Sequence, residues 1–302
     1  MQLGMIGLGK MGANMTRRLL SGEHDLMVFD RNPEAVAAAR AYGVIGTESP
    51  EDLAGKLTAP RAVWVMVPSG EPTEQTIAHL AEVLDRGDSI IDGGNSNYKD
   101  TVRRAAWLAE RGLHAVDVGT SGGIWAIEEG YSMTVGGDAE AVGRLGPIFE
   151  TLAPAADKGW GHVGPSGSGH FVKMVHNGVE YGLMEAYAEG FNLMHHKEEF
   201  GLDISQVAEI WRHGSVVRSW LLNLAARALA DDADLDGVAP YVQDSGEGRW
   251  AVAEAIELGV AIPVITSALE QRFASRGAEN FGNKLLNALR NQFGGHELQR
   301  KV

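Results

Sequence analysis

The first half of the chain alternates short aliphatic and β-branched runs with segments of helical periodicity. The apolar runs predict strands at Gln2–Ile6, Asp25–Phe29, Ala62–Val67, Ser89–Ile91 and His114–Val118. Amphipathic helices fit between them, for example at Lys10–Leu20, Glu74–Leu84 and Lys99–Glu110. Such alternation is typical of a parallel sheet with crossover helices, because a parallel strand pair needs a long connection. The chain is therefore expected to begin with a doubly wound α/β domain.

The pattern changes at a glycine-rich stretch, Gly159–Gly169. From about Phe171 to Leu289, long helical patterns follow one another with no convincing strand. A chain of 302 residues has room for two domains of ordinary size. We predict an α/β domain at residues 1–163 and an all-helical domain at residues 164–302.

Composition narrows the functional classes. With 44% hydrophobic and 22% charged residues the chain is globular in composition, and Cys 0 excludes disulfides and thiolate chemistry. A formal charge of -14 argues against nucleic-acid binding. No apolar run reaches the roughly 20 residues that cross a bilayer, and the N-terminus lacks a signal-peptide pattern. We expect a cytoplasmic protein that binds neither nucleic acid nor membrane.

The segment Gly-Leu-Gly-Lys-Met-Gly, residues 7–12, lies between the first predicted strand and helix. Its glycines permit a tight turn that brings backbone N–H groups and a helix N-terminus to a pyrophosphate. Asp30 ends the next strand, where a carboxylate accepts hydrogen bonds from ribose hydroxyls and repels a 2′-phosphate. This Rossmann-type pattern predicts NAD, with NADP possible because Arg31 is adjacent. The expected cofactor contacts are Gly7, Leu8, Gly9, Lys10, Met11, Gly12, Asp30, Arg31, Val67 and Asn95.

Two further polar loops each follow a predicted strand. They are Asp92-Gly93-Gly94-Asn95-Ser96 and Gly119-Thr120-Ser121-Gly122-Gly123. Open α/β sheets bind ligands at the carboxyl ends of their strands, where such loops expose N–H groups and hydroxyls. Either loop alone is equally compatible with ordinary turn chemistry. Together they indicate a small-molecule site.

A polar stripe follows the linker on a predicted helix. Its members, at spacing i, i+3, i+4 and i+7, are Lys173, His176, Asn177 and Glu180. The neighbouring apolar face, expected to be buried, is Val172, Val175, Val179 and Leu183. Periodicity alone favours an ordinary solvated face with polar pairs along the helix. An amine and a carboxylate two turns apart, however, can serve opposite ends of a small molecule, one removing a proton and the other returning one.

The run Gly169–Tyr181 closely resembles the signature helix of 6-phosphogluconate dehydrogenases, and both polar loops resemble that family's substrate loops. The resemblance extends over essentially the whole chain, which has the length of the family's shorter, typically NAD-linked branch. It implies oxidation of the C3 hydroxyl of 6-phosphogluconate, loss of carbon dioxide from the 3-keto intermediate, and protonation of the enediol to ribulose 5-phosphate. It implies no metal.

The resemblance also implies roles for individual residues. Lys173 would accept the C3 hydroxyl proton and then polarise the ketone, which requires its pKa to fall from about 10.4 toward about 7 to 8. Glu180 would protonate the enediol carbon. The implied substrate contacts are Asn95, Ser121, Gly122, Gly123, His176, Asn177, Tyr181, Arg272, Arg290 and His296. Of these, the Ser121 loop would take the carboxylate, and Tyr181 with the arginines and His296 would take the phosphate.

The segment from Arg290 to His296 resembles the family's C-terminal segment that enters the partner subunit's site, which implies a homodimer or homotetramer. Removing the residues after Asn287 should then abolish activity in a chain that still folds.

One loop departs from the family. Where longer members carry a Lys and a Thr before a Trp, this chain has Ser245-Gly246-Glu247-Gly248-Arg249-Trp250, which would weaken phosphate binding or shift it to Arg249.

Two alternatives remain open. A β-hydroxyacid dehydrogenase of the same superfamily shares the glycine-rich turn, the catalytic Lys and an Asn four residues later, and acts on small unphosphorylated acids. It has no need for Glu180, Tyr181 and the C-terminal Arg and His. The second alternative is a dinucleotide-binding regulatory protein without catalytic activity. The presence of both Lys173 and Glu180 argues against it.

Overall fold

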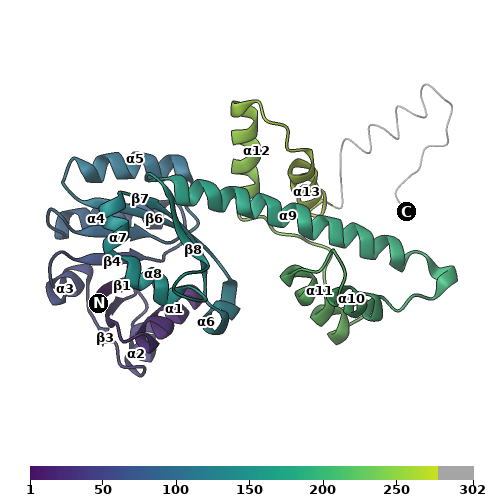
Figure 1. The fold of residues 1–302 in the computed structure, drawn as a ribbon, viewed down its shortest axis with the longest axis horizontal. Helices are drawn as coiled ribbons and strands as arrows, with labels where there is room; N and C mark the ends of the chain where they lie inside the picture. The colour runs from purple at the N-terminus through teal and green to yellow at the C-terminus, as the bar shows by residue number, and fades with distance from the viewer. Residues whose placement is uncertain (278–302) are drawn as a thin grey trace. The chain divides into compact units, whose positions relative to one another are not determined.

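The computed structural model describes residues 1–277. Eight strands form one sheet in the order β3-β2-β1-β4-β5-β6-β7-β8 (Figure 1). Neighbours pair in parallel except β6 and β7, which are antiparallel. The strands are β1 (Gln2–Ile6), β2 (Asp25–Phe29), β3 (Ile45–Gly46), β4 (Ala62–Val65), β5 (Ser89–Asp92), β6 (His114–Ser121), β7 (Ser132–Gly137) and β8 (Trp160–Gly164).

Helices connect the strands and then make up the rest of the described chain. Those of the α/β region are α1 (Lys10–Ser21), α2 (Pro33–Arg40), α3 (Pro50–Lys56), α4 (Glu71–Val83), α5 (Tyr98–Ala109), α6 (Ala126–Glu129), α7 (Ala139–Arg144) and α8 (Gly146–Leu152). After them come α9 (Ser168–His195), α10 (Ile204–Arg212), α11 (Trp220–Asp231), α12 (Glu247–Leu258) and α13 (Pro263–Ala274). Within residues 1–277, no helix is both long and apolar enough to span a membrane.

Successive side chains of a strand point to opposite faces of the sheet. Both faces are buried here, as is usual for a mostly parallel sheet. In β4, Trp64 joins one apolar cluster while Val63 and Val65 join the other. The first cluster packs the sheet against α1 and α8, and the second packs it against α3, α4 and α5 (Figure 1). The prediction of a doubly wound Rossmann-type domain followed by helices is therefore confirmed.

All five predicted strands are present, and three observed strands, β3, β7 and β8, were not predicted. β3 has only two residues, too few for a periodic signal. β8 lies inside the glycine-rich stretch that was interpreted as a linker. β8 forms a strand because it pairs with β7, although its glycine-rich composition does not favour one. The sheet therefore extends further along the chain than the pattern indicated.

The chain divides within α9 into two compact units, Met1–Asn177 and a second unit that begins at Gly178 and is described up to residue 277. We call them the α/β unit and the helical unit. In the helical unit α10 packs against α11, and α12 packs against α13 (Figure 1). The sequence-based limits, 1–163 and 164–302, instead assign all of α9 to the second domain, and they stay a prediction.

Candidate active site

The glycine-rich turn joins β1 to α1 and has the backbone geometry that a dinucleotide fingerprint needs. Gly7 has φ +98°, a conformation that favours glycine, and a Cβ there would lie 2.3 Å from the Met66 carbonyl oxygen. A Cβ on Gly12 would lie 2.0 Å from the Gly7 carbonyl oxygen. Both positions therefore require glycine, one for the turn and one for close packing of α1 on the turn.

Asp30, at the end of β2, reaches back to this turn. Its Oδ2 accepts a hydrogen bond from the Leu8 backbone N–H at 2.6 Å, and its Oδ1 accepts one from Asn32 N–H at 2.8 Å. Each carboxylate oxygen keeps acceptor capacity for a ribose hydroxyl. Asp30 thus has two functions in the site, because it fixes the loop and presents negative charge beside it.

A pocket of about 670 Å³ opens over this turn in the α/β unit. Five of the predicted cofactor residues line it: Gly7, Gly9, Asp30, Arg31 and Val67. The pocket is also lined by residues of α3 and α4 that were not predicted from the sequence. They are Pro50, Pro72, Gln75, Thr76 and His79. The signal that points to these residues is positional, since α4 follows β4 and begins at the crevice edge of the sheet.

The start of α9 is held against the middle of β6 by a buried carboxylate. Asp117, only 1% exposed, accepts hydrogen bonds from Gly167 N–H at 2.7 Å and His170 N–H at 2.9 Å. These are helix-initiating N–H groups that otherwise lack partners. A Cβ on Gly119 would lie 2.4 Å from the Lys173 Cβ. The glycine of the Gly119–Gly123 loop therefore allows α9 to place Lys173 directly against that loop.

The structure brings three of the four stripe residues, Lys173, His176 and Asn177, to this loop, whereas the half-buried Glu180 belongs to the helical unit. Lys173 and Asn177 are buried, at 9% and 8% exposure, and His176 lies between them at the surface. The Lys173 Nζ is 3.5 Å from His176 Nδ1, which is 3.2 Å from Asn177 Oδ1. His176 Nε2 lies 3.5 Å from the Ser121 hydroxyl. The imidazole thus bridges the amine of Lys173 and the Ser121 loop at long hydrogen-bonding distances.

The apolar face predicted to be buried beside this stripe is exposed, so that prediction is wrong for the single chain. Val172, Val175, Val179 and Leu183 are 37% to 48% exposed. The buried positions are instead Lys173, Met174, Asn177 and Tyr181. The first half of α9 buries its polar side because close packing on β6 uses that side, and the aliphatic side is left outward.

In the helical unit, Tyr181 and Arg272 are brought together. The Arg272 guanidinium lies 3.6 Å from the centre of the Tyr181 ring, and its Nη1 donates to the Gln243 carbonyl at 2.7 Å. The Ser245 backbone N–H donates to the Tyr181 hydroxyl at 3.3 Å. The Ser245–Trp250 segment, whose last four residues form the first turn of α12, therefore packs against Tyr181. Arg290 and His296 lie outside the described residues.

The same loop disfavours Arg249 as a replacement phosphate ligand. Arg249 donates two hydrogen bonds to the Asp244 carboxylate, at 2.9 and 3.1 Å. These bonds, together with those from Arg276, hold the pKa of Asp244 well below its usual range. The Ser245 hydroxyl also donates a hydrogen bond to Glu247 Oε2 at 2.5 Å. The loop contributes no unpaired cation, which is consistent with the weaker phosphate binding expected from its sequence.

Sequence models of protein families agree with this geometry. A model described as the NAD binding domain of 6-phosphogluconate dehydrogenase matches residues 2–162, and one for the C-terminal domain of the same enzyme matches residues 169–280 and 195–302. The chain belongs to the 6-phosphogluconate dehydrogenase family. It carries that family's NAD-binding domain, so the prediction of an NAD(P)-dependent oxidoreductase is confirmed.

Individual relatives cover the whole chain. A 6-phosphogluconate dehydrogenase of Haloferax volcanii, described as NAD(+)-dependent and decarboxylating, is 44% identical over 100% of this chain and 99% of its own length. A putative 6-phosphogluconate dehydrogenase of Bacillus subtilis is 42% identical over 100% of both. Among solved structures, the Plasmodium falciparum 6-phosphogluconate dehydrogenase superposes with a TM-score of 0.83 at 28% identity, over 100% of this chain and 66% of that one.

Proposed function

We propose that this chain catalyses the oxidative decarboxylation of 6-phosphogluconate to ribulose 5-phosphate and carbon dioxide, with NAD as the preferred hydride acceptor. The observation that supports it most directly is the placement of Lys173. Its side chain is buried, packs on Gly119 and adjoins His176, Asn177 and the Ser121 loop. These neighbours suit an amine that must bind a hydroxylated acid and exchange a proton with it.

NAD supplies the hydride acceptor when bound, and the protein's own residues manage the protons. Lys173 takes the C3 hydroxyl proton as the C3 hydride leaves, and the resulting ammonium polarises the new ketone. The β-keto acid then loses its C1 carboxylate as carbon dioxide: the electrons of the broken C1–C2 bond form a C2=C3 double bond, and the Lys173 ammonium gives its proton to the former ketone oxygen, which yields the enediol. Lys173 takes this proton back when the carbon is protonated to give ribulose 5-phosphate. Glu180, two turns further along α9, returns a proton to carbon. On a helix the two Cα atoms lie about 10 Å apart along the axis, so they serve different ends of the reacting unit.

The substrate contacts are proposed to fall into three groups. Ser121, Gly122 and Gly123 would bind the carboxylate through hydroxyl and backbone N–H groups, with Asn95 between nicotinamide and sugar. His176 and Asn177 would bind substrate hydroxyls. Tyr181 and Arg272 would bind the phosphate, joined by Arg290 and His296 from the partner subunit.

The preference for NAD is proposed from Asp30. A 2′-phosphate placed where Asp30 binds the ribose would meet a carboxylate that the Leu8 N–H holds in place. Arg31 also lines the pocket, so NADP would be accepted less readily but not excluded.

A homodimer or homotetramer is also proposed. The four aliphatic residues on the outer side of α9 form an exposed apolar stripe of the kind that marks a protein interface. A second copy of the chain would cover it.

The reaction is tested by following NAD and NADP reduction with 6-phosphogluconate and 3-hydroxyisobutyrate as parallel substrates, with carbon dioxide release measured alongside. We expect NAD reduction and stoichiometric carbon dioxide release with 6-phosphogluconate. Turnover of 3-hydroxyisobutyrate alone would replace this proposal with the β-hydroxyacid dehydrogenase alternative. Tight NAD binding without turnover of either acid would favour the silent regulatory protein.

A further inference from the structure

A buried polar network lies behind the loop that carries Asn95, and no part of the proposed chemistry uses it. Asp92 ends β5 at 5% exposure. Its Oδ1 accepts from Gly94 N–H at 3.2 Å, and its Oδ2 accepts from the Ser96 hydroxyl at 2.7 Å. These two bonds enclose Asn95, so the conformation of the loop depends on the orientation of the Asp92 carboxylate.

Arg104, on α5, holds that carboxylate. Its Nη2 donates to Asp92 Oδ2 at 2.9 Å, and the Arg104 side chain is itself 6% exposed. Its Nη1 also reaches Glu74 on α4 at 3.3 Å. Arg103 and Arg104 together hold the pKa of Glu74 below its usual value, with Arg103 the larger contributor. A buried carboxylate next to a ligand loop is thus paired with a buried guanidinium.

The network continues from Arg104 to the catalytic helix. The same Nη2 lies 3.4 Å from the Thr101 hydroxyl, which is 2.8 Å from His170 Nδ1. His170 is 1% exposed, and within residues 1–277 its Nε2 has no hydrogen-bond partner. In that part of the chain, Thr101 is therefore the group that orients the His170 ring.

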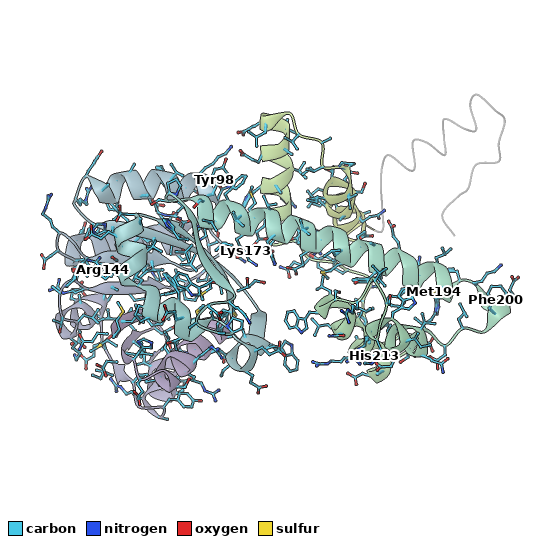
Figure 2. The ribbon with its side chains drawn as sticks, in the orientation of Figure 1. Tyr98, Arg144, Lys173, Met194, Phe200 and His213 are labelled. Carbon is cyan, nitrogen blue, oxygen red and sulfur yellow. The ribbon has the colours of Figure 1, made fainter. Side chains whose placement is uncertain are left out.

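Two contacts support the same connection between α5 and α9. The rings of Tyr98 and Phe171 meet edge to face with centroids 5.2 Å apart, and Figure 2 shows Tyr98 beside the start of α9 near Lys173. A Cβ on Gly167 would lie 2.5 Å from the Val102 Cγ2. The first turns of α9 thus rest on α5, and His170 lies one turn before Lys173 on that helix.

We infer that Arg104 is a positioning residue that sets the Asn95 loop and the Lys173 turn relative to one another, with Thr101 and His170 as its link to α9. It touches neither substrate nor cofactor. Through Asp92 it fixes the loop proposed to lie between nicotinamide and sugar, and through Thr101 it fixes the helix that carries the proposed base. This inference rests on the proposed function for the identity of the base and the substrate.

The test uses three variants of the full chain. Arg104→Lys keeps a cation but loses the guanidinium fork, and Thr101→Val keeps the shape but removes the hydroxyl that joins Arg104 to His170. The control is Arg103→Lys, because Arg103 is the adjacent residue and binds the same Glu74 carboxylate, at 2.7 and 2.9 Å, on the exposed side of α5. Thr101→Val keeps the inference testable if Arg104→Lys does not fold.

Steady-state kinetics with NAD and 6-phosphogluconate give the first measurement. We expect kcat to fall about 10- to 100-fold in Arg104→Lys and Thr101→Val, with KM for NAD within about twofold of wild type, because sub-ångström misplacement of reacting groups slows chemistry more than it weakens binding. Arg103→Lys should match the wild type. A merely structural role would instead lower the melting temperature and the active fraction while leaving kcat per active site unchanged.

The second measurement does not depend on turnover. Acetic anhydride labelling of Lys173, quantified by peptide mass spectrometry, should be at least about threefold faster in Thr101→Val and Arg104→Lys than in the wild type, because the buried amine loses its fixed position. Wild-type labelling and wild-type kcat in both variants would overturn the inference. If the wild type itself fails to turn over 6-phosphogluconate, the proposed function fails, and the labelling rates still decide whether the network positions Lys173.

Discussion

The two units bury their apolar side chains to very different extents. In the α/β unit, two large clusters enclose the sheet from both sides and include fully buried residues such as Trp64 and Phe149. In the described part of the helical unit, the buried clusters are small: Ile204, Ala208, Ala226 and Leu229 in one, and Tyr181, Ala268 and Leu269 in the other. The nucleotide-binding half has a complete core of its own, whereas the helical half keeps much apolar surface for another contact.

Buried carboxylates differ between the two units, although each unit contains buried polar atoms that have no hydrogen-bond partner among the described residues. In the α/β unit, buried charges such as Asp92, Arg104 and Asp117 all have hydrogen-bond partners within the unit. In the helical unit, Glu247 is 2% exposed, yet among the described residues its Oε1 has no partner. A buried acceptor without a donor is costly, so the helical unit is expected to gain partners on assembly or substrate binding.

The largest expected effect tests whether the chemistry depends on the α/β half. Lys173→Ala should lower kcat by about 10²- to 10⁴-fold, the usual contribution of a positioned acid or base, with NAD affinity nearly unchanged. Steady-state kinetics and NAD titration by fluorescence check both. Lys197→Ala is the matched control, since Lys197 follows the same helix and pairs with Glu199 at the surface. A Lys173→Ala enzyme with wild-type kcat would contradict the assignment of the base.

The next effect tests whether a second copy covers the helical unit. Leu183→Asp should raise the dissociation constant of the oligomer about 100-fold or more, because burying an unpaired charge costs several kcal/mol. Light scattering over a dilution series measures it. Ile45→Asp is the control, being equally exposed at 46% against 47% but located on β3. Unchanged oligomeric mass in Leu183→Asp would remove the stripe from the interface.

A smaller effect would sharpen the comparison at the phosphate end. Ser245→Lys places a cation next to the Tyr181 hydroxyl and Glu247. We expect KM for 6-phosphogluconate to fall about tenfold, which is about 1.4 kcal/mol of added phosphate attraction. KM for NAD should stay the same, because the cofactor turn belongs to the other unit. Equal changes in both constants would mean that the loop acts on folding and not on phosphate.

The smallest effect concerns stability of the helical unit and its pH dependence. Because Arg249 and Arg276 depress the pKa of Asp244, its carboxylate stabilises the folded state above its unfolded pKa of about 3.9, and that contribution is lost as pH falls through the folded value. Asp244→Asn should cost about 1 kcal/mol at pH 7, since both arginines are partly exposed. Thermal melts should show the difference from wild type shrinking below about pH 4. A difference that persists there would assign the effect to packing.

Several site features could be predicted from the sequence because they are local. The turn around Gly7 and Gly12, the carboxylate at Asp30 and the spacing from Lys173 to Glu180 each depend on a few neighbouring residues. The strands were found for the same reason, since a short run of aliphatic and β-branched residues is visible directly in the chain. The short β3 and the glycine-rich β8 escaped prediction because their pairing partners, not their own residues, stabilise them.

The sequence by itself determined the fold class, the family, the dinucleotide turn and the polar stripe on α9. The tertiary structure decided which side of that helix is buried, and it reversed the expectation, because Gly119 lets β6 pack against Lys173 while the valines remain outside. It also joined Asp92, Arg104, Thr101 and His170 into one network. Those contacts link residues as much as 69 positions apart, and periodicity, which compares only neighbours, carries no information about such distances.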